Sequence, residues 1–214
     1  MLRRSAKSPF MPSTLVFPGG RLDDEDGDPS EATTWELAAK RECREEAGVD
    51  LGPRALEWFD TWLTPSAESR RRYLARFFLA TLEPGEGDEA VADGHETHAG
   101  RWAAIDDHLA AWRDGEVDLP PPTVCILLRL QAWARDAGVS TQADAMRAIL
   151  TAATALDPGG VILPKVILEG GGPVILMPHD DAYGDAPGEA AEPPSRVSIL
   201  PKRFIRDPKG WRPQ

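Results

Sequence analysis

Residues 40–49, KRECREEAGV, place three glutamates close together along the chain. In a helix Glu42, Glu45 and Glu46 would stand at i, i+3 and i+4, so their carboxylates would converge on one face. Like charges in that arrangement destabilise a helix unless something neutralises them. The stretch therefore predicts either a solvated acidic face or a site that binds cations.

Composition limits the class of protein. The 214 residues include 35 acidic and 24 basic side chains, for a net charge of −11. Such a charge disfavours nucleic acid as a partner and suits a chain that binds cations. Cys43 and Cys125 are the two cysteines, and the sequence has neither an apolar run of about 20 residues nor a secretory leader. We expect a reduced, cytoplasmic protein that does not bind membranes.

The residues before the acidic stretch predict a strand, a tight turn and a helix. Residues 13–18, STLVFP, are short, apolar and β-branched, and Gly19-Gly20 follows them. The helix is expected over Ala32–Ala47, ending at Gly48. Its start is open between an Asp28 cap followed by proline and a capping box from Thr33. Four residues form its predicted apolar face: Leu37, Ala38, Cys43 and Ala47.

The rest of the chain predicts a mixed α/β order. Residues 55–64 and 72–82 have strand composition and could pair as a hairpin. A further strand is expected near 97–102, a short helix at 105–113, and a packed pair of helices at 123–137 and 140–155. The pair is predicted to bury Leu127, Leu128, Leu130 and Trp133 in its core.

A composition change after residue 155 predicts a β-rich extension. Its strands are expected over 161–168, 173–178 and 195–205. Because the first two strands are apolar and would otherwise expose unpaired edges, we expect the extension either to form a homodimer or to wall a substrate pocket.

Taken with the Gly-Gly turn, the segment Arg41-Glu42-x-x-Glu45-Glu46-x-Gly48-Val49 resembles the Nudix hydrolase box, G-x5-E-x7-R-E-U-x-E-E-x-G-U, where U is aliphatic. Cys43 stands at the U position as a small hydrophobe. Between Gly20 and Arg41 lie 20 residues, about seven more than the pattern has. Counted back from Arg41, Thr33 occupies the place of the first glutamate. Glu31 or Glu36 could substitute for it only loosely, so that role is left unassigned.

The interrupted box also resembles one Nudix subgroup. The segments FMPSTLVFPGGRLDDED, AAKRECREEAGV and RRRYLARFFLA are similar to a split-box group that includes the peroxisomal diphosphatase acting on coenzyme A and acyl-CoA. In that group a strand ending in Leu-Arg-Arg precedes the first segment. Here the chain begins at Met1-Leu2-Arg3-Arg4, and most of that strand is expected to be missing.

The resemblance implies a fold and a domain arrangement. It implies an α/β/α sandwich with a mixed sheet, a Nudix hydrolase domain at residues 1–155 and a C-terminal extension at 156–214. Within the domain the core would reach about residue 115 and the helical pair would cover 116–155.

The resemblance also implies a metal site and a reaction. Glu42, Glu45 and Glu46 would bind Mg²⁺ or Mn²⁺, which prefer hard oxygen ligands. Water would then attack the diphosphate of a nucleoside diphosphate linked to another group. Arg41 would orient Glu45, the Gly19-Gly20 turn would let the backbone approach closely, and Glu45 or Glu96 would act as the base.

The substrate and several residue roles have alternatives. Coenzyme A or acyl-CoA is the first expectation, with ADP-ribose, NADH or another dinucleotide as alternatives, or a sensor that binds nucleotide without turnover. Arg70, Arg71 and Arg72 could grip the 3′-phosphate of coenzyme A or be solvated. Glu96 could be a surface residue. His179, Asp180 and Asp181 could form a second metal site, but are read as polar loop residues.

Overall fold

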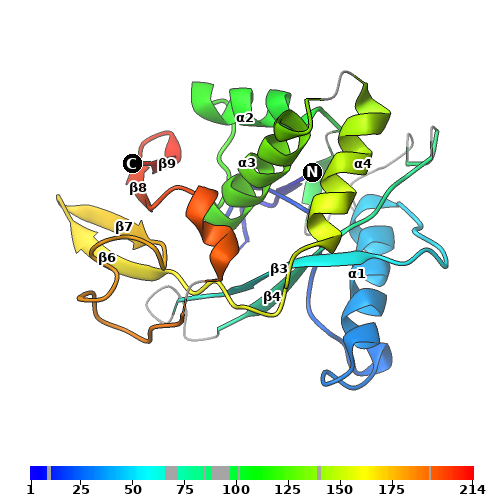
Figure 1. The fold of residues 1–214 in the computed structure, drawn as a ribbon, viewed down its shortest axis with the longest axis horizontal. Coiled ribbons are helices and arrows are strands. Elements are labelled where there is room, and N and C mark those ends of the chain that lie inside the picture. The colour runs from blue at the N-terminus through cyan, green and yellow to red at the C-terminus, as the bar shows by residue number, and fades with distance from the viewer. Residues whose placement is uncertain are drawn as a thin grey trace.

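The computed structural model describes residues 1–8, 11–65, 72–83, 85–87, 97–100, 102–138, 141–192 and 194–214. The helices of these segments are α1 (Ala32–Ala47), α2 (Ile105–Asp114), α3 (Pro121–Asp136) and α4 (Gln142–Thr154). None of them is both long and apolar enough to cross a membrane. Figure 1 shows α3 and α4 over the β3–β4 hairpin and α1 toward one end of it.

The described strands form three antiparallel sheets. The first has the order β2-β1-β5, with β1 (Leu2–Arg4) between β2 (Leu15–Val16) and β5 (Thr97–Gly100). The second is the expected hairpin of β3 (Glu57–Leu63) and β4 (Leu74–Leu79). The third joins β6 (Lys165–Glu169), β7 (Gly172–Leu176), β8 (Arg203–Asp207) and β9 (Gly210–Pro213). Among the described residues, parallel pairing is confined to a bridge between Trp62 and Ile162.

The β3–β4 hairpin lies between the helical layers. Its register shifts between Trp58 and Asp60. At such a bulge the side-chain alternation is interrupted, and here Phe59 and Asp60 both reach α3. Arg76 instead contacts both Trp35 of α1 and Trp58 of the hairpin. The hairpin is thus covered by α3 and α4 on one face and by α1 on the other, as in an α/β/α sandwich.

A buried ion pair joins the hairpin to α3. Arg129 donates to Asp60 over 2.6 Å, and both side chains are fully buried. Asp60 also accepts hydrogen bonds from the Thr61 backbone N–H and the Trp62 indole. Because a lone buried charge is costly, this arrangement favours one register of the hairpin against the helix.

The helical pair packs together as expected, but Leu127 and Leu128, predicted for its core, pack in or against the largest core cluster instead. Ile126 and Leu130 of α3 share a buried cluster with Ala153 of α4 and Phe59 of the hairpin, and Trp133 packs against it. The Trp133 and Phe59 rings meet edge to face, with centroids 6.3 Å apart. The prediction that Trp133 belongs to the core between the helices is confirmed.

The C-terminal extension shares the largest core cluster with the rest of the chain. Residues from both parts are buried in that cluster: Trp62, Leu109, Trp112, Leu119, Ile162, Ile175, Met177, Phe204 and Trp211. The apolar strands are therefore covered largely by their own chain. Homodimerisation and a domain boundary at residue 155 stay predictions.

The strand expected over residues 195–205 is wrong in its first half. Ser195–Ile199 is a 3₁₀-helix, and the strand β8 begins only at Arg203. Pro194 precedes the helix and Pro201 follows it, and neither proline has an N–H to donate to a sheet. The final strand β9 was not expected.

Helix α1 has the predicted bounds, but its N-cap and its buried face differ from the predicted ones. Its N-cap is Glu31, without a side-chain cap, and it ends at Gly48 with φ 68°. Neither Asp28 nor Thr33 is therefore the N-cap, and the Thr34 hydroxyl donates to the Asp28 carbonyl over 2.7 Å. Leu37 is 52% exposed whereas Glu46 is 7% exposed, so the expected burial of Leu37 is wrong. The helix turns a glutamate inward because Glu46 has a hydrogen-bond partner there.

If the extension is part of one cooperative core, truncating Phe204 should destabilise the whole protein. Phe204 is fully buried, so Phe204→Ala should lower the free energy of unfolding by about 3–5 kcal/mol. Leu168, 84% exposed in the same extension, is the control, and Leu168→Ala should change it by less than about 0.5 kcal/mol. Urea unfolding followed by tryptophan fluorescence measures both. A separate early transition for the extension would contradict the shared core.

Candidate functional site

The Gly19-Gly20 turn lies directly against α1. The Gly19 N–H donates to Glu46 Oε2 over 2.9 Å. A Cβ atom at residue 20 would overlap the Glu42 carboxylate, so a larger residue would displace that side chain. Glycine therefore allows the backbone to approach two of the three glutamates.

Arg41 connects the glutamates to the loop before the helix. Its guanidinium donates to both carboxylate oxygens of Asp26, over 3.0 and 2.8 Å, and to the Arg21 carbonyl over 2.9 Å. It also donates to Glu42 Oε1 over 3.0 Å and to Glu45 Oε2 over 3.1 Å. Three carboxylates thus accept hydrogen bonds from one guanidinium, and Asp23 forms a fourth ion pair with it at 3.6 Å, so the guanidinium offsets much of their mutual repulsion.

Asp26 is a site residue that the sequence analysis missed. Five residues separate it from Gly20, so counted forward it stands where the box has its first glutamate. The count back from Arg41 reached the exposed Thr33 because the extra residues lie between Asp26 and Arg41. A forward count would have found Asp26. Its hydrogen bonds from Arg41 hold the pKa of its carboxyl below the ordinary value.

The three glutamates have different environments. Burial raises the pKa of Glu42 above its ordinary value, and Arg41 opposes that rise. Glu46 is buried against the turn. Glu45 has a side chain 53% exposed, so its carboxylate can meet solvent.

The donor chemistry fits a hard divalent cation. Among the described residues, however, no three Asp, Glu, His or Cys side chains are gathered as a ready metal site. Glu42 and Glu45 bind Arg41, and Glu46 binds Gly19. Because a carboxylate has about four acceptor positions, Glu42 and Glu45 could bind a cation while they stay hydrogen-bonded to Arg41.

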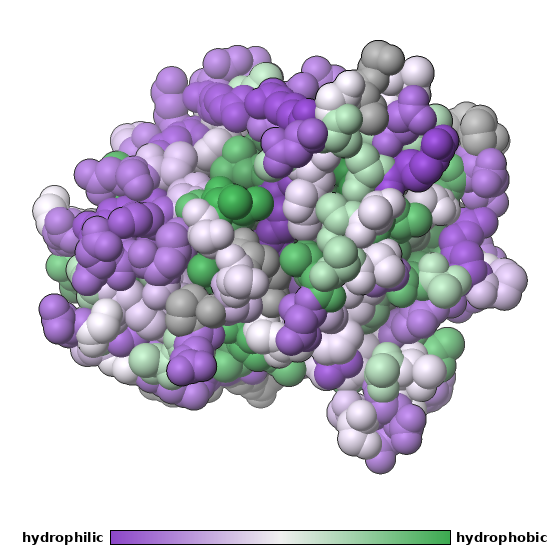
Figure 2. All heavy atoms as spheres, in the orientation of Figure 1, coloured by the Kyte–Doolittle hydropathy of each residue, from purple (hydrophilic) through white to green (hydrophobic). Residues whose placement is uncertain are grey.

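An open cleft runs beside the glutamates. Its lining includes the Gly19-Gly20 turn, Glu42, Trp35, Arg76 and Met146, and the extension contributes Pro164 and Ile175. Figure 2 shows apolar side chains in the middle of this view of the molecule, with mostly polar residues around them. Both apolar and charged parts of a ligand could therefore contact this cleft.

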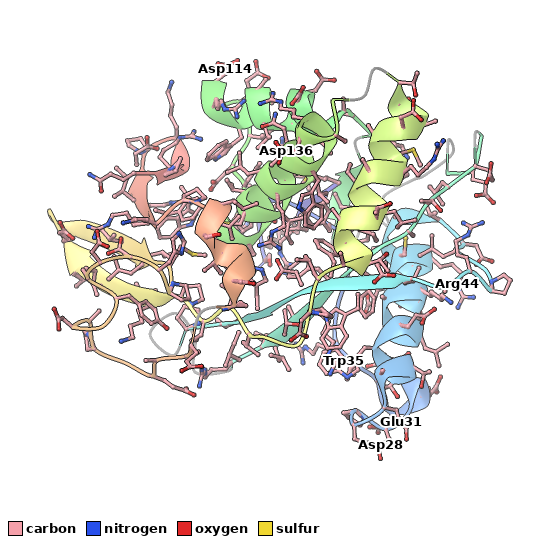
Figure 3. All side chains as sticks on the ribbon, viewed as in Figure 1. Asp28, Glu31, Trp35, Arg44, Asp114 and Asp136 are labelled. Carbon is pink, nitrogen blue, oxygen red and sulfur yellow. The ribbon has the colours of Figure 1, made fainter. Side chains whose placement is uncertain are left out.

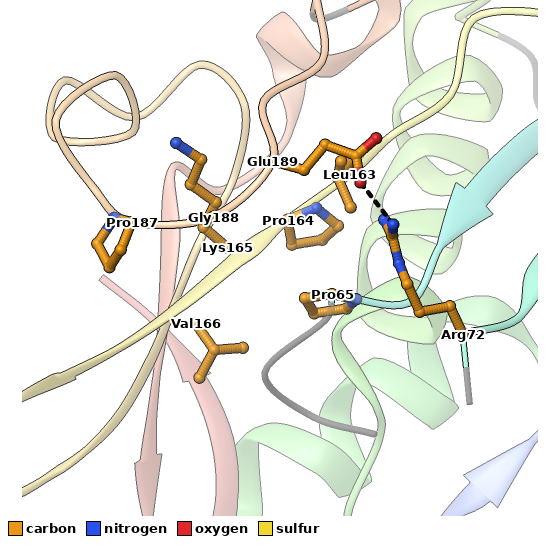
Figure 4. A pocket seen from close by; sticks show the side chains of 9 residues that line it. All are labelled: Pro65, Arg72, Leu163, Pro164, Lys165, Val166, Pro187, Gly188 and Glu189. Atoms are coloured by element: carbon orange, nitrogen blue, oxygen red, sulfur yellow. Dashed lines mark hydrogen bonds and ion pairs between the residues drawn. The ribbon is translucent and has the colours of Figure 1, made fainter. Parts of the chain in front are cut away.

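Of the predicted arginine cluster and the predicted loop base, Arg72 alone lies among the described residues. Arg70, Arg71 and Glu96 lie outside the described residues. Arg72 forms an ion pair with Glu189 of the extension (Figure 4). It also donates to the Thr64 carbonyl over 3.1 Å. Its charge is already matched by a carboxylate.

The alternative second metal site has other partners as well. Arg203 binds both oxygens of Asp180 at 2.6 Å, Lys202 pairs with Asp181, and His179 Nε2 lies 3.0 Å from the Leu200 carbonyl. These contacts support the interpretation of His179, Asp180 and Asp181 as polar loop residues.

Comparison with known proteins agrees with this arrangement of turn, arginine and glutamates. A family model described as the NUDIX domain matches residues 1–121. Because the match covers more than half of the chain, the protein belongs to the Nudix family.

One curated relative and one solved structure are similar to the chain. It is 29% identical to "Putative nudix hydrolase 7" of Caenorhabditis elegans over 168 residues, 61% of this chain and 54% of that protein. The chain thus spans about half the length of this relative. A NUDIX hydrolase crystal structure from Alicyclobacillus acidocaldarius matches 59% of this chain and 79% of its own, with 22% identity and a TM-score of 0.50. That likeness shows the Nudix fold.

The pairing of Asp26 with Arg41 predicts a pH-dependent stability difference. Asp26→Asn removes a charge-assisted pair and should lower the free energy of unfolding by about 1–2 kcal/mol near pH 7. Since the folded pKa of Asp26 is lowered, the pair contributes fully above the unfolded pKa of about 3.9. Its contribution is lost as the pH falls through the folded pKa, so wild type and variant should converge in acid.

Thr33→Ala is the control, because Thr33 holds the same place when counted from Arg41 and is exposed. It should change the free energy of unfolding by less than about 0.5 kcal/mol at every pH. Denaturant unfolding from pH 7 to pH 3 measures both variants. If Thr33→Ala lowered the free energy of unfolding and Asp26→Asn did not, the assignment of Asp26 to the place of the first glutamate would be wrong.

Proposed function

We propose that the protein is a Mg²⁺- or Mn²⁺-dependent hydrolase that cleaves the diphosphate bond of a nucleoside diphosphate linked to another group. Membership of the Nudix family supports this function. The observation on which it chiefly depends is the contact of the Gly19-Gly20 turn with Glu42 and Glu46, beside the Arg41 network. A purely solvated acidic face would need neither the turn nor the arginine.

The proposed metal ligands are Glu42, Glu45 and Glu46. A divalent cation bound there would neutralise the diphosphate and lower the pKa of a water molecule. The two glycines would leave room for the substrate phosphates near the turn. Arg41, fixed by Asp26, would hold Glu42 and Glu45 in place.

Glu45 is the proposed base among the described residues. Its exposed carboxylate can contact water, and its bond to Arg41 sets its direction. Glu96 remains a second proposal for this role. In either case the proton leaves the attacking water as its oxygen bonds to phosphorus, and the bond to the leaving phosphate oxygen breaks.

Coenzyme A or acyl-CoA is the proposed substrate, supported by the similarity to the split-box subgroup. The cleft beside the glutamates includes apolar side chains such as Phe77, Met146 and Leu74, which could contact the thiol or acyl end of such a molecule. Arg70, Arg71 and Arg72 remain proposed phosphate ligands. Arg72 would first have to exchange Glu189 for the substrate.

A substitution at Glu45 should separate activity from stability. Glu45→Gln keeps the side-chain volume but gives a poorer ligand for a hard cation and no base, so turnover should fall at least 100-fold, or about 2.7 kcal/mol. The melting temperature should change by only a few degrees, because Glu45 is half exposed. Glu31→Gln, at the exposed N-cap of the same helix, is the matched control and should keep wild-type turnover.

The measurement uses coenzyme A, acyl-CoA, ADP-ribose and NADH with Mg²⁺ or Mn²⁺, and identifies the products by mass. The proposed chemistry yields two phosphate-bearing products from one diphosphate. Near wild-type turnover by Glu45→Gln would exclude Glu45 as an essential ligand or base. Nucleotide binding by the wild type with no product from any compound would favour a sensor over a hydrolase.

A further inference from the structure

Arg76 of β4 is held between two indole rings. Its guanidinium carbon lies 4.2 Å from the Trp35 ring centroid and 4.3 Å from that of Trp58. Both rings are fixed in turn. The Trp58 indole donates to the Asp60 carbonyl and the Thr61 hydroxyl, each over 3.1 Å, and the Trp35 indole donates to the Pro29 carbonyl over 2.9 Å.

The charge of Arg76 has no counterion among the described residues. No hydrogen bond or ion pair joins its guanidinium to them, and its Nε atom is buried without a partner. By contrast, Arg41, Arg129 and Arg203 all bind carboxylates. Burial lowers the pKa of Arg76, but a guanidinium stays charged in proteins. Stacking alone thus offsets the burial of this cation, which is an unusual arrangement unless an anion joins it.

The two indoles limit the directions in which the guanidinium can bind. Its N–H groups point outward in its own plane, and both ring centroids lie within 4.3 Å of its central carbon, so a ligand can reach only the donors that the indoles leave open. A planar fork of donors fixed in this way suits the oxygens of a phosphate group, which it can bind through two parallel hydrogen bonds.

Arg76 lies in the same cleft as the glutamates but away from them. Trp35 and Arg76 both line this cleft, as does Glu42. Trp35 precedes Glu42 by seven residues, about two helical turns, so the two positions share a face of α1 and are about 10 Å apart along its axis. Figure 3 shows Trp35 on the side of α1 that faces the β3–β4 hairpin, whereas Arg44 is on the opposite side.

We propose that Arg76, clamped by Trp35 and Trp58, binds a second phosphate group of the substrate, separate from the diphosphate held at the glutamates. The substrate class is therefore a diphosphate compound with an additional phosphate on its nucleoside part. This inference rests on the proposed function for the position of the diphosphate. It assigns phosphate recognition to Arg76, in addition to the arginine run that ends at Arg72.

Ligands without a diphosphate bond test the site independently of turnover. Binding of adenosine 3′,5′-bisphosphate and adenosine 5′-monophosphate is measured with Mg²⁺ by isothermal titration calorimetry. The bisphosphate should bind wild type about 10- to 100-fold more tightly than the monophosphate does. This ratio corresponds to the free energy of one or two charge-assisted hydrogen bonds. The bisphosphate should also change tryptophan fluorescence, because two indoles contact the guanidinium.

Arg76→Gln should reduce this ratio to within about threefold of unity, and Arg76→Lys, which keeps the charge but not the planar fork, should give an intermediate ratio. Arg44→Gln is the matched control, since it removes the same charge from an exposed position on the far side of α1 and should preserve the ratio.

Equal binding of the two nucleotides by the wild type would overturn the proposal whether or not the variants fold. So would an unchanged ratio in folded Arg76→Gln or Arg76→Lys, which would leave Arg76 as a brace between α1 and the hairpin. Because neither ligand can be hydrolysed at a diphosphate, a lack of turnover on the substrate panel would test the proposed function without affecting this result.

Discussion

The repulsion among the carboxylates of α1 is the constraint on which the site depends. Glu42 and Glu45 lie beside Asp26 around a single guanidinium, that of Arg41. Without that cation, three negative charges would be brought together in a partly buried place, where their repulsion is screened less than in water. Arg41 therefore stabilises the helix and orients the proposed ligands at the same time.

The loop before α1 is longer than in the Nudix box. It remains compatible with the box because the extra residues follow Asp26. The Gly20-to-Asp26 part retains the spacing of the family pattern, and Arg41 still reaches the acidic residue across the added chain. The added segment includes Pro29, whose carbonyl accepts the Trp35 indole hydrogen bond. The loop is thus connected both to the carboxylates and to the stack around Arg76.

Contacts far apart in sequence hold the hairpin that faces this site. Asp60 and Arg129 form their buried pair across 69 residues, and the Thr61 hydroxyl donates to the Pro158 carbonyl. Ile162 exchanges backbone hydrogen bonds with residues 61 and 63. The start of the extension therefore pairs with the same strand that places Trp58 against Arg76.

The amino-acid sequence was sufficient to predict the family-like box, the bounds of α1, the hairpin and the packing of α3 with α4. These features depend on local signals: the periodicity of apolar residues, a glycine at a helix end, and the spacing of charged residues within a few turns. The same signals failed where distant residues decide the outcome. A helical pattern cannot show that Leu37 is exposed and Glu46 buried, because that depends on where the Gly19 N–H lies.

Only the tertiary structure identified Asp26 as the partner of Arg41, matched Arg72 with Glu189, and placed Arg76 between two indoles without a counterion among the described residues. Each of these assignments joins residues from different elements, and electrostatic and stacking energies depend on distances of a few ångströms that the order of residues does not specify. The sequence by itself determined which chemical groups are available; the packing of α1 against the hairpin and the turn decided which of them meet.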